Sequence, residues 1–151
     1  MANLKRTPCV GVCSTTYGDL VCRGCKRFAH EIVQWNGFGE SQRSLVWKRL
    51  FELRAGAVSA CLKVVDPERL RQQALAVQVH DPDDLCELNL AFEVLRRCAC
   101  SDTDLRRLGL RVSEEPLQAQ ISSEQVLANI EREFYDRSVA QYERNFHTVA
   151  H

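Results

Sequence analysis

The sequence predicts a mainly α-helical protein that begins with a small four-cysteine metal-binding head, built from a knuckle and two helices. Four cysteines gather in the first sixth of the chain. After them, apolar residues recur every three or four positions, which is the spacing of one helix face. No strand-like alternation lasts more than a few residues. We therefore expect a metal-binding module at 1–58 and a helical C-terminal region at 59–151.

The composition is ordinary for a globular protein, with 45% apolar and 26% charged residues among 151. No apolar run approaches the roughly 20 residues that span a membrane. The N-terminus has no apolar stretch typical of a secretory signal. We therefore expect a cytoplasmic protein, where thiols stay reduced and disulfides are rare. In that setting the eight cysteines favour metal binding over disulfide bridges.

The four early cysteines form two close pairs in a C-x3-C-x8-C-x2-C pattern: a first pair, Cys9 and Cys13, and a second pair, Cys22 and Cys25. Two such pairs joined by a short polar loop can bring four thiolates to one tetrahedral metal. A glycine lies inside each pair, where a tight turn needs one. The alternatives are four unrelated thiols or two disulfides. Metal binding is favoured, because two spaced pairs with glycine-bearing turns are much more specific than a lone C-x-x-C.

Zinc is the favoured metal, because four cysteines fill a closed site and the second pair resembles a zinc knuckle. An iron–sulfur cluster is the alternative, since it also takes four cysteines with loose spacing. A site filled by four protein ligands is structural rather than catalytic. His30 could replace one cysteine, but a place on a helix face is the better interpretation.

Two helices are expected after the second pair. The first carries Phe28, Ile32 and Trp35 on one face and is broken at Asn36-Gly37. The second begins near Glu40 and continues to about residue 65. Its inward stripe consists of Val46, Leu50, Leu53 and Ala57.

The head resembles a family of small bacterial proteins named DUF1289, which are labelled as predicted iron–sulfur proteins. The similarity covers residues 8–54 and includes all four cysteines, the Val21-Cys22-Arg23-Gly24-Cys25 knuckle, Glu31-Ile32, Trp35, Gln42-Arg43 and Arg54. Gly39 stands where that family tends to have Ser or Thr as a helix N-cap. The resemblance implies a metal or iron–sulfur centre but no established activity, and it does not extend to residues 60–151.

The C-terminal region reads as further helices. Asp66-Pro67 and Asp81-Pro82 are two helix-start signals, with Asp as N-cap and Pro in the first turn. We expect Ser101 to cap a short helix that Gly109 closes. Residues 110–120 are expected to form a loop. Ser122 and Gln125 then form a capping-box pattern before a final helix at 122–147.

The basic residues of the head raise the question of nucleic acid. Residues 1–54 carry five more basic than acidic residues, and residues 55–151 carry the opposite excess. RNA or DNA could contact the basic side chains and stack on an aromatic ring. Alternatively, the aromatic residues are core and the basic head docks on the acidic remainder. The candidate binding residues are Arg23, Lys26, Arg27, Arg43 and Trp35.

The final helix carries a candidate interface at Phe134, Tyr142 and Phe146. Such a long terminal helix either leaves part of its apolar stripe for a protein partner or a second copy, or folds back and buries it on residues 67–100. The remaining cysteines, Cys61, Cys86, Cys98 and Cys100, are expected to be buried or half-buried thiols.

No catalytic constellation emerges from the sequence, so an enzymatic role has no candidate residues. The leading hypothesis is a non-enzymatic metal-binding accessory or adaptor protein, with a structural four-cysteine site and a surface for protein or nucleic acid. The alternative is an iron–sulfur accessory protein with a redox or cluster-dependent role.

Overall fold

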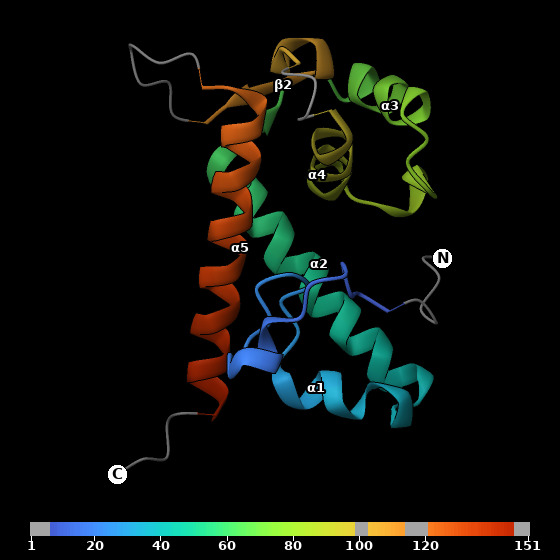
Figure 1. The fold of residues 1–151 in the computed structure, drawn as a ribbon. Helices are drawn as coiled ribbons and strands as arrows, with labels where there is room; N and C mark the ends of the chain where they lie inside the picture. Colours follow the sequence, from blue (N-terminus) through green and yellow to red (C-terminus); the bar gives the residue numbers. More distant parts are fainter. Residues whose placement is uncertain (1–6, 99–102, 114–120, 147–151) are drawn as a thin grey trace. The chain divides into compact units, whose positions relative to one another are not determined.

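The computed structural model describes residues 7–98, 103–113 and 121–146, and these are mainly helical, as predicted (Figure 1). Contacts divide them into two compact units. One, the helical unit, consists of the described residues within 54–133. The other, the cysteine unit, consists of 7–53 together with 134–146. The predicted domains 1–58 and 59–151 are continuous in sequence, whereas these units divide inside α2 (Glu40–Cys61) and α5 (Ser123–Phe146).

The cysteine unit begins with a short 3-10 helix, η1 (Ser14–Tyr17), followed by α1 (Ala29–Gln34) and the 3-10 turn η2 (Trp35–Gly37). The Phe28 amide that precedes α1 donates to the Glu31 carboxylate at 2.8 Å, which satisfies one of the free amides of the first turn. The predicted helix over Phe28–Trp35 is therefore present but shorter, with its end tightened into η2.

Helix α2 begins next to Gly39, as the sequence suggested. The Gly39 amide donates to Gln42 Oε1 at 2.8 Å, and the Gly39 carbonyl accepts from Arg43 at 3.1 Å. Glycine thus serves as the N-cap, with the glutamine supplying the reciprocal bond of a capping box. On the predicted inward stripe, Val46, Leu50 and Ala57 are buried and Leu53 is half-buried.

The expectation that this helix continues to residue 65 is wrong. It ends at Cys61, and β1 (Leu62–Val64) follows and pairs antiparallel with β2 (Leu110–Val112). In this register Leu62 faces Val112 and Val64 faces Leu110. The two strands are three residues each and lie far apart in sequence, so neither shows a recognisable alternation.

The helical unit is built from α3 (Pro67–Ala76), α4 (Glu87–Cys98) and the 3-10 helix η5 (Leu105–Leu108). Helix α3 contacts both α4 and η5, and α4 contacts β1. The core of this unit is apolar and includes Leu62, Leu70, Ala74, Leu90, Phe92, Val94, Leu95, Leu108, Leu110, Val126 and Ile130.

Of the two Asp-Pro helix starts, the first is confirmed and the second is wrong. Asp66 accepts from the Arg69 amide at 3.1 Å and caps α3. Asp81 instead has a left-handed backbone, with φ 47°, makes no side-chain cap bond and precedes only the 3-10 turn η3 (Pro82–Asp84). The chain is extended again at Leu85, so α4 begins at Glu87.

Gly109 closes η5 in the left-handed conformation, with φ 78°. Its carbonyl accepts the amides of Val65 and Asp66 at 2.9 and 3.1 Å, just after β1. A Cβ atom at this position would lie 2.4 Å from the Asp66 carbonyl oxygen. Both the backbone angle and the close approach therefore require glycine. Ser101, the predicted cap of this short helix, lies outside the described residues, and Asp104 caps it instead.

Helix α5 follows the predicted boundaries closely. Ser122 accepts from the Gln125 amide at 3.1 Å, which is one half of the predicted capping box. The Gln125 side chain donates to Asn129 at 3.0 Å instead of returning to the cap. No helix within the described ranges is both long and apolar enough to cross a membrane.

Candidate metal centre

The second cysteine pair lies on a tight hairpin. Val21 and Phe28 form an isolated antiparallel bridge, and between them the Cys22 amide donates to the Arg27 carbonyl at 2.9 Å. The Lys26 amide returns to the Cys22 carbonyl at 2.8 Å, which requires a left-handed φ of 65° at Lys26. A non-glycine residue in this conformation carries a backbone cost, which the hairpin hydrogen bonds offset. The result is a knuckle with both cysteines at its turn.

Both sulfurs of the second pair are buried, and donors point at them. Burial acts to raise the pKa of Cys22, but the amides of Cys25, Ser14 and Gly24 and the Cys25 side chain outweigh it and lower that pKa from 9.0 to about 7. Burial raises the pKa of the Cys25 thiol, against the opposing effect of the Arg27 guanidinium. Amides aimed at a sulfur stabilise it as a thiolate, which is the form that binds metals.

The first pair is more open. Cys9 is exposed and accepts from the Gly11 amide at 3.4 Å, while Cys13 is half-buried and lies 2.9 Å from the Thr15 hydroxyl. Gly11 has φ 96°, so this turn also uses a conformation that favours glycine. The first pair thus forms a local turn of its own.

The segment that carries the first pair contacts the knuckle directly. A Cβ atom on Gly24 would lie 2.6 Å from the Val12 carbonyl oxygen and 2.8 Å from Val10. Cys22 Sγ lies 3.5 Å from the same Val12 oxygen, and the Arg23 amide donates to Ser14 Oγ at 2.8 Å. Glycine at position 24 is what allows the two cysteine-bearing segments to approach this closely.

These contacts hold the two cysteine-bearing segments next to each other, but they do not gather the four cysteines into one group. Within the part of the chain that the structure describes, no three His, Cys, Asp or Glu side chains converge as a metal-binding group. The donor chemistry of the second pair nevertheless fits a thiophilic metal, since two buried sulfurs receive amide and guanidinium hydrogen bonds. His30 is exposed, and its ring contacts those of Phe28 and Phe146.

Arg27 links the candidate metal site to the core of the cysteine unit. Arg27 is only 4% exposed, and its Nε donates to Cys25 Sγ at 3.3 Å. The guanidinium lies 4.9 Å from the centre of the buried Trp35 ring. Arg43 donates to the Trp35 carbonyl at 3.1 and 3.0 Å and lies 5.5 Å from the same ring. Arg27, Trp35 and Arg43 therefore form one packed group.

The other predicted nucleic-acid residues are not gathered on one exposed surface. Lys26 is 2% exposed, donates to the Gly24 carbonyl at 3.0 Å and lies over the Phe134 ring. Arg23 is exposed, pairs with Asp19 at 3.2 Å and lies over the Tyr135 ring. Of the five candidate residues, only Arg23 is exposed.

Sequence reasoning missed a buried ion pair in the same unit. Glu31 accepts two bonds of 2.6 Å from Arg49, whose guanidinium lies 4.0 Å from the centre of the Phe28 ring. The residues are 18 positions apart, on different helices. An acidic residue on the otherwise apolar side of the first helix is the only sequence signal that could have indicated it.

The candidate interface on α5 belongs to the cysteine unit, and most of it is covered there. Phe134 is buried, Tyr142 is half-buried and Phe146 is 49% exposed. The rings of Tyr142 and Phe146 meet the Phe28 ring edge-on, at 5.2 and 5.8 Å between centres. These residues therefore help to cover Phe28.

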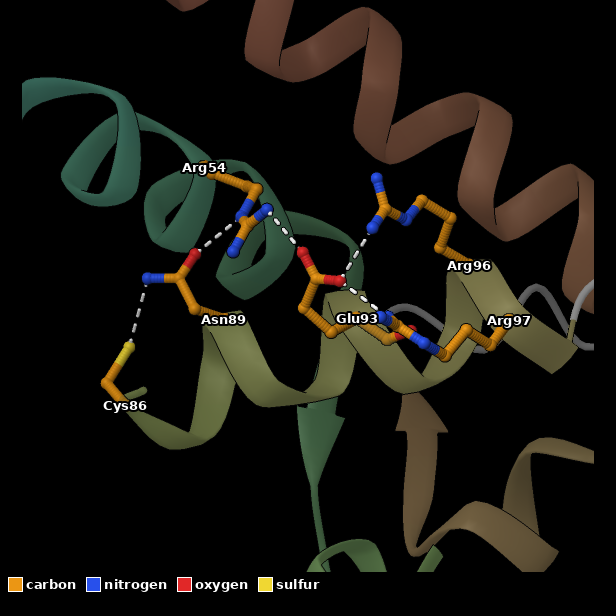
Figure 2. A network of polar contacts seen from close by, with 6 residues as sticks. All are labelled: Arg54, Cys86, Asn89, Glu93, Arg96 and Arg97. Carbon is orange, nitrogen blue, oxygen red and sulfur yellow. Dashed lines mark hydrogen bonds and ion pairs between the residues drawn. The ribbon is translucent and has the colours of Figure 1, made fainter. Parts of the chain in front are cut away.

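In the helical unit, Cys86 is exposed rather than buried or half-buried as expected, and Asn89 donates to its sulfur at 3.3 Å. Asn89 also accepts from Arg54, which pairs with Glu93, so Cys86 lies at the edge of a polar network (Figure 2). Cys61 and Cys98 are half-buried. Cys100 lies outside the described residues.

Residues 7–54 match DUF1289, a family described as a protein of unknown function. This confirms the resemblance, over nearly the predicted range and with all four early cysteines inside it. We call residues 7–54 the DUF1289 segment. No curated protein and no solved structure gave a significant match to the chain.

Proposed function

We propose that the DUF1289 segment binds one metal ion, with zinc favoured, through Cys9, Cys13, Cys22 and Cys25, in a non-enzymatic accessory or adaptor protein. The observation that carries this proposal is the Cys22–Cys25 hairpin, with its buried sulfurs and the amides aimed at Cys22. The close approach of Gly24 to the Val12 carbonyl and the Val10 side chain supports the recruitment of the first pair, because it holds the two segments together.

When bound, zinc would supply a closed tetrahedral cross-link rather than a reactive centre. The chain's own residues position the ligands: the knuckle fixes the second pair, and the turn from Cys9 to Cys13 contributes the first pair. A segment of this size with few apolar residues gains much of its stability from such a cross-link. A structural metal is therefore the role that suits this set of ligands.

A protein partner suits the adaptor role better than a nucleic acid. Lys26 and Arg27 are buried, so their charges do not face solvent. Several apolar side chains near the cysteines are exposed instead, among them Val12 at 65% and Tyr17 at 89%. Exposed apolar side chains around a small site favour contact with another protein.

The test is the metal content of the whole 151-residue chain, purified without chelators after growth with zinc and iron. We expect about one zinc per chain in the natural sequence, bound through the four thiolates. Cys22→Ser should lose the metal. Cys86→Ser is the matched control, because Cys86 is exposed and outside the DUF1289 segment, and it should keep the metal.

Chelation should also change the backbone amide spectrum of residues 9–35 while the helices of the helical unit persist. Stoichiometric iron with visible absorption would favour the iron–sulfur alternative over zinc. Absence of bound metal after reconstitution under reducing, anaerobic conditions with either zinc or iron would refute metal binding.

A further inference from the structure

Arg27 is a buried cation, and among the described residues the polar contact of its side chain is to a sulfur of the candidate site. The residue is 4% exposed, its Nε donates to Cys25 Sγ at 3.3 Å, and its guanidinium lies 4.9 Å from the centre of the Trp35 ring. In the described parts of the chain no carboxylate pairs with it. The nearby buried carboxylate, Glu31, binds Arg49 instead.

A buried guanidinium without an anionic partner destabilises the folded state, because its charge is no longer solvated by water. The cost falls if negative charge resides on the sulfur that it contacts. Four thiolates around one dication would carry a net charge of about −2, which a neighbouring cation offsets. The position of Arg27 is therefore consistent with a metal–thiolate centre and less so with a neutral thiol.

We propose that Arg27 is a positioning residue of the metal centre, which orients Cys25 and compensates the charge of the bound metal–thiolate group. This inference rests on the proposed function. Trp35 and Arg43 support it: the Trp35 ring packs against the Arg27 guanidinium, and two hydrogen bonds from Arg43 to the Trp35 carbonyl fix the backbone of that residue. Partners that hydrogen-bond to metal ligands commonly tune affinity and geometry in this way.

The experiment compares zinc affinity in Arg27→Met and Arg23→Met by competition with a chromophoric chelator. Arg23 is the matched control, because it flanks the same pair but is exposed and paired with Asp19. We expect the zinc dissociation constant to rise about 10–100-fold in Arg27→Met, as for other residues that hydrogen-bond to metal ligands. In Arg23→Met it should change by less than about threefold, because solvent screens an exposed charge.

Two further measurements separate a positioning role from a general loss of stability. Cobalt(II) substitution gives a thiolate-to-metal absorption band, which should shift in Arg27→Met and stay unchanged in Arg23→Met. Arg27→Lys should recover part of the affinity, because an ammonium keeps the charge but cannot stack as a planar fork on Trp35.

The outcomes distinguish this inference from the proposed function. If the natural sequence binds neither zinc nor cobalt, the proposed function fails. If it binds both, and Arg27→Met matches Arg23→Met in affinity and spectrum, the role of Arg27 is refuted. Should Arg27→Met not fold, Arg27→Lys decides: natural affinity and an unshifted cobalt band would refute the role, and weaker binding with a shifted band would support it.

Discussion

Glu93 is the carboxylate whose removal should cost the helical unit most. It accepts bonds from three arginines, Arg54 at 3.0 Å, Arg96 at 2.8 Å and Arg97 at 2.6 Å (Figure 2). The Glu93 and Arg54 side chains are only 14% and 12% exposed. The Glu93→Gln substitution keeps the size of the side chain but removes the negative charge that three cations share.

The magnitude follows from burial. Removing one partner of a buried ion pair costs about 3–5 kcal/mol, because the other charge is left uncompensated. Arg54 keeps its bond to Asn89 at 2.7 Å, which offsets only part of that loss. Arg96→Met is the matched control: its side chain is 47% exposed, and such a helix-surface pair contributes about 0.3–0.5 kcal/mol.

Urea unfolding followed by far-ultraviolet circular dichroism measures both variants against the natural sequence. From the two ranges above, we expect the decrease in the free energy of unfolding to be about ten times larger in Glu93→Gln than in Arg96→Met. Equal effects of less than about 1 kcal/mol would refute the argument, because they would mean that the network is solvated like a surface pair.

The stability lost in the same variant should depend on pH. Burial acts to raise the pKa of Glu93, but Arg54, with Arg97 and Arg96, outweighs it and holds that pKa below its ordinary value of 4.5. A depressed pKa in the folded state stabilises the protein fully above the unfolded value, and this contribution is lost as pH falls through the folded value. The stability gap between the natural sequence and Glu93→Gln should therefore narrow below pH 4.5. A gap that stays constant with pH would contradict this assignment.

Three further substitutions test other parts of the structure. Glu31→Gln should lower the free energy of unfolding by about 3–5 kcal/mol, measured by tryptophan fluorescence in urea. Asp19→Asn removes an exposed ion pair and should lower it by less than about 1 kcal/mol. Similar decreases in the two variants would contradict the argument from burial. Gly109→Ala should lower the melting temperature, because left-handed backbone alone costs about 1–2 kcal/mol, whereas Gly37→Ala enters open space and should leave it nearly unchanged. Gly24→Ala should push the first-pair segment away and weaken zinc binding in a chelator titration; natural affinity would show that the close approach is not needed.

Local signals in the sequence predicted much of the fold. The caps at Asp66 and Ser122 and the left-handed Gly109 each depend on residues within a few positions, so their chemistry is visible in one stretch of sequence. The same local logic failed at Asp81, where the short turn after the aspartate delays the helix by several residues. The paired cysteines were found from spacing alone, and the knuckle at Cys22 follows that spacing.

Interactions between distant residues could not be predicted in this way. The partner of β1 lies about 48 residues away, so no alternation reveals it. Glu31 and Arg49 look like surface charges on two helices until the helices pack. The basic residues around Cys25 suggested an exposed patch, because sequence shows the charge of Lys26 and Arg27 but not their burial.

The division of the chain has a consequence for its synthesis. The cysteine unit takes its last part from residues 134–146, where Tyr142 and Phe146 cover Phe28. During translation the DUF1289 segment leaves the ribosome long before those rings are made, at about 5–20 residues per second. For several seconds, therefore, Phe28 of the nascent chain lacks the two rings that cover it in the folded protein. An early metal cross-link between the cysteine pairs would hold the segment in order during that interval.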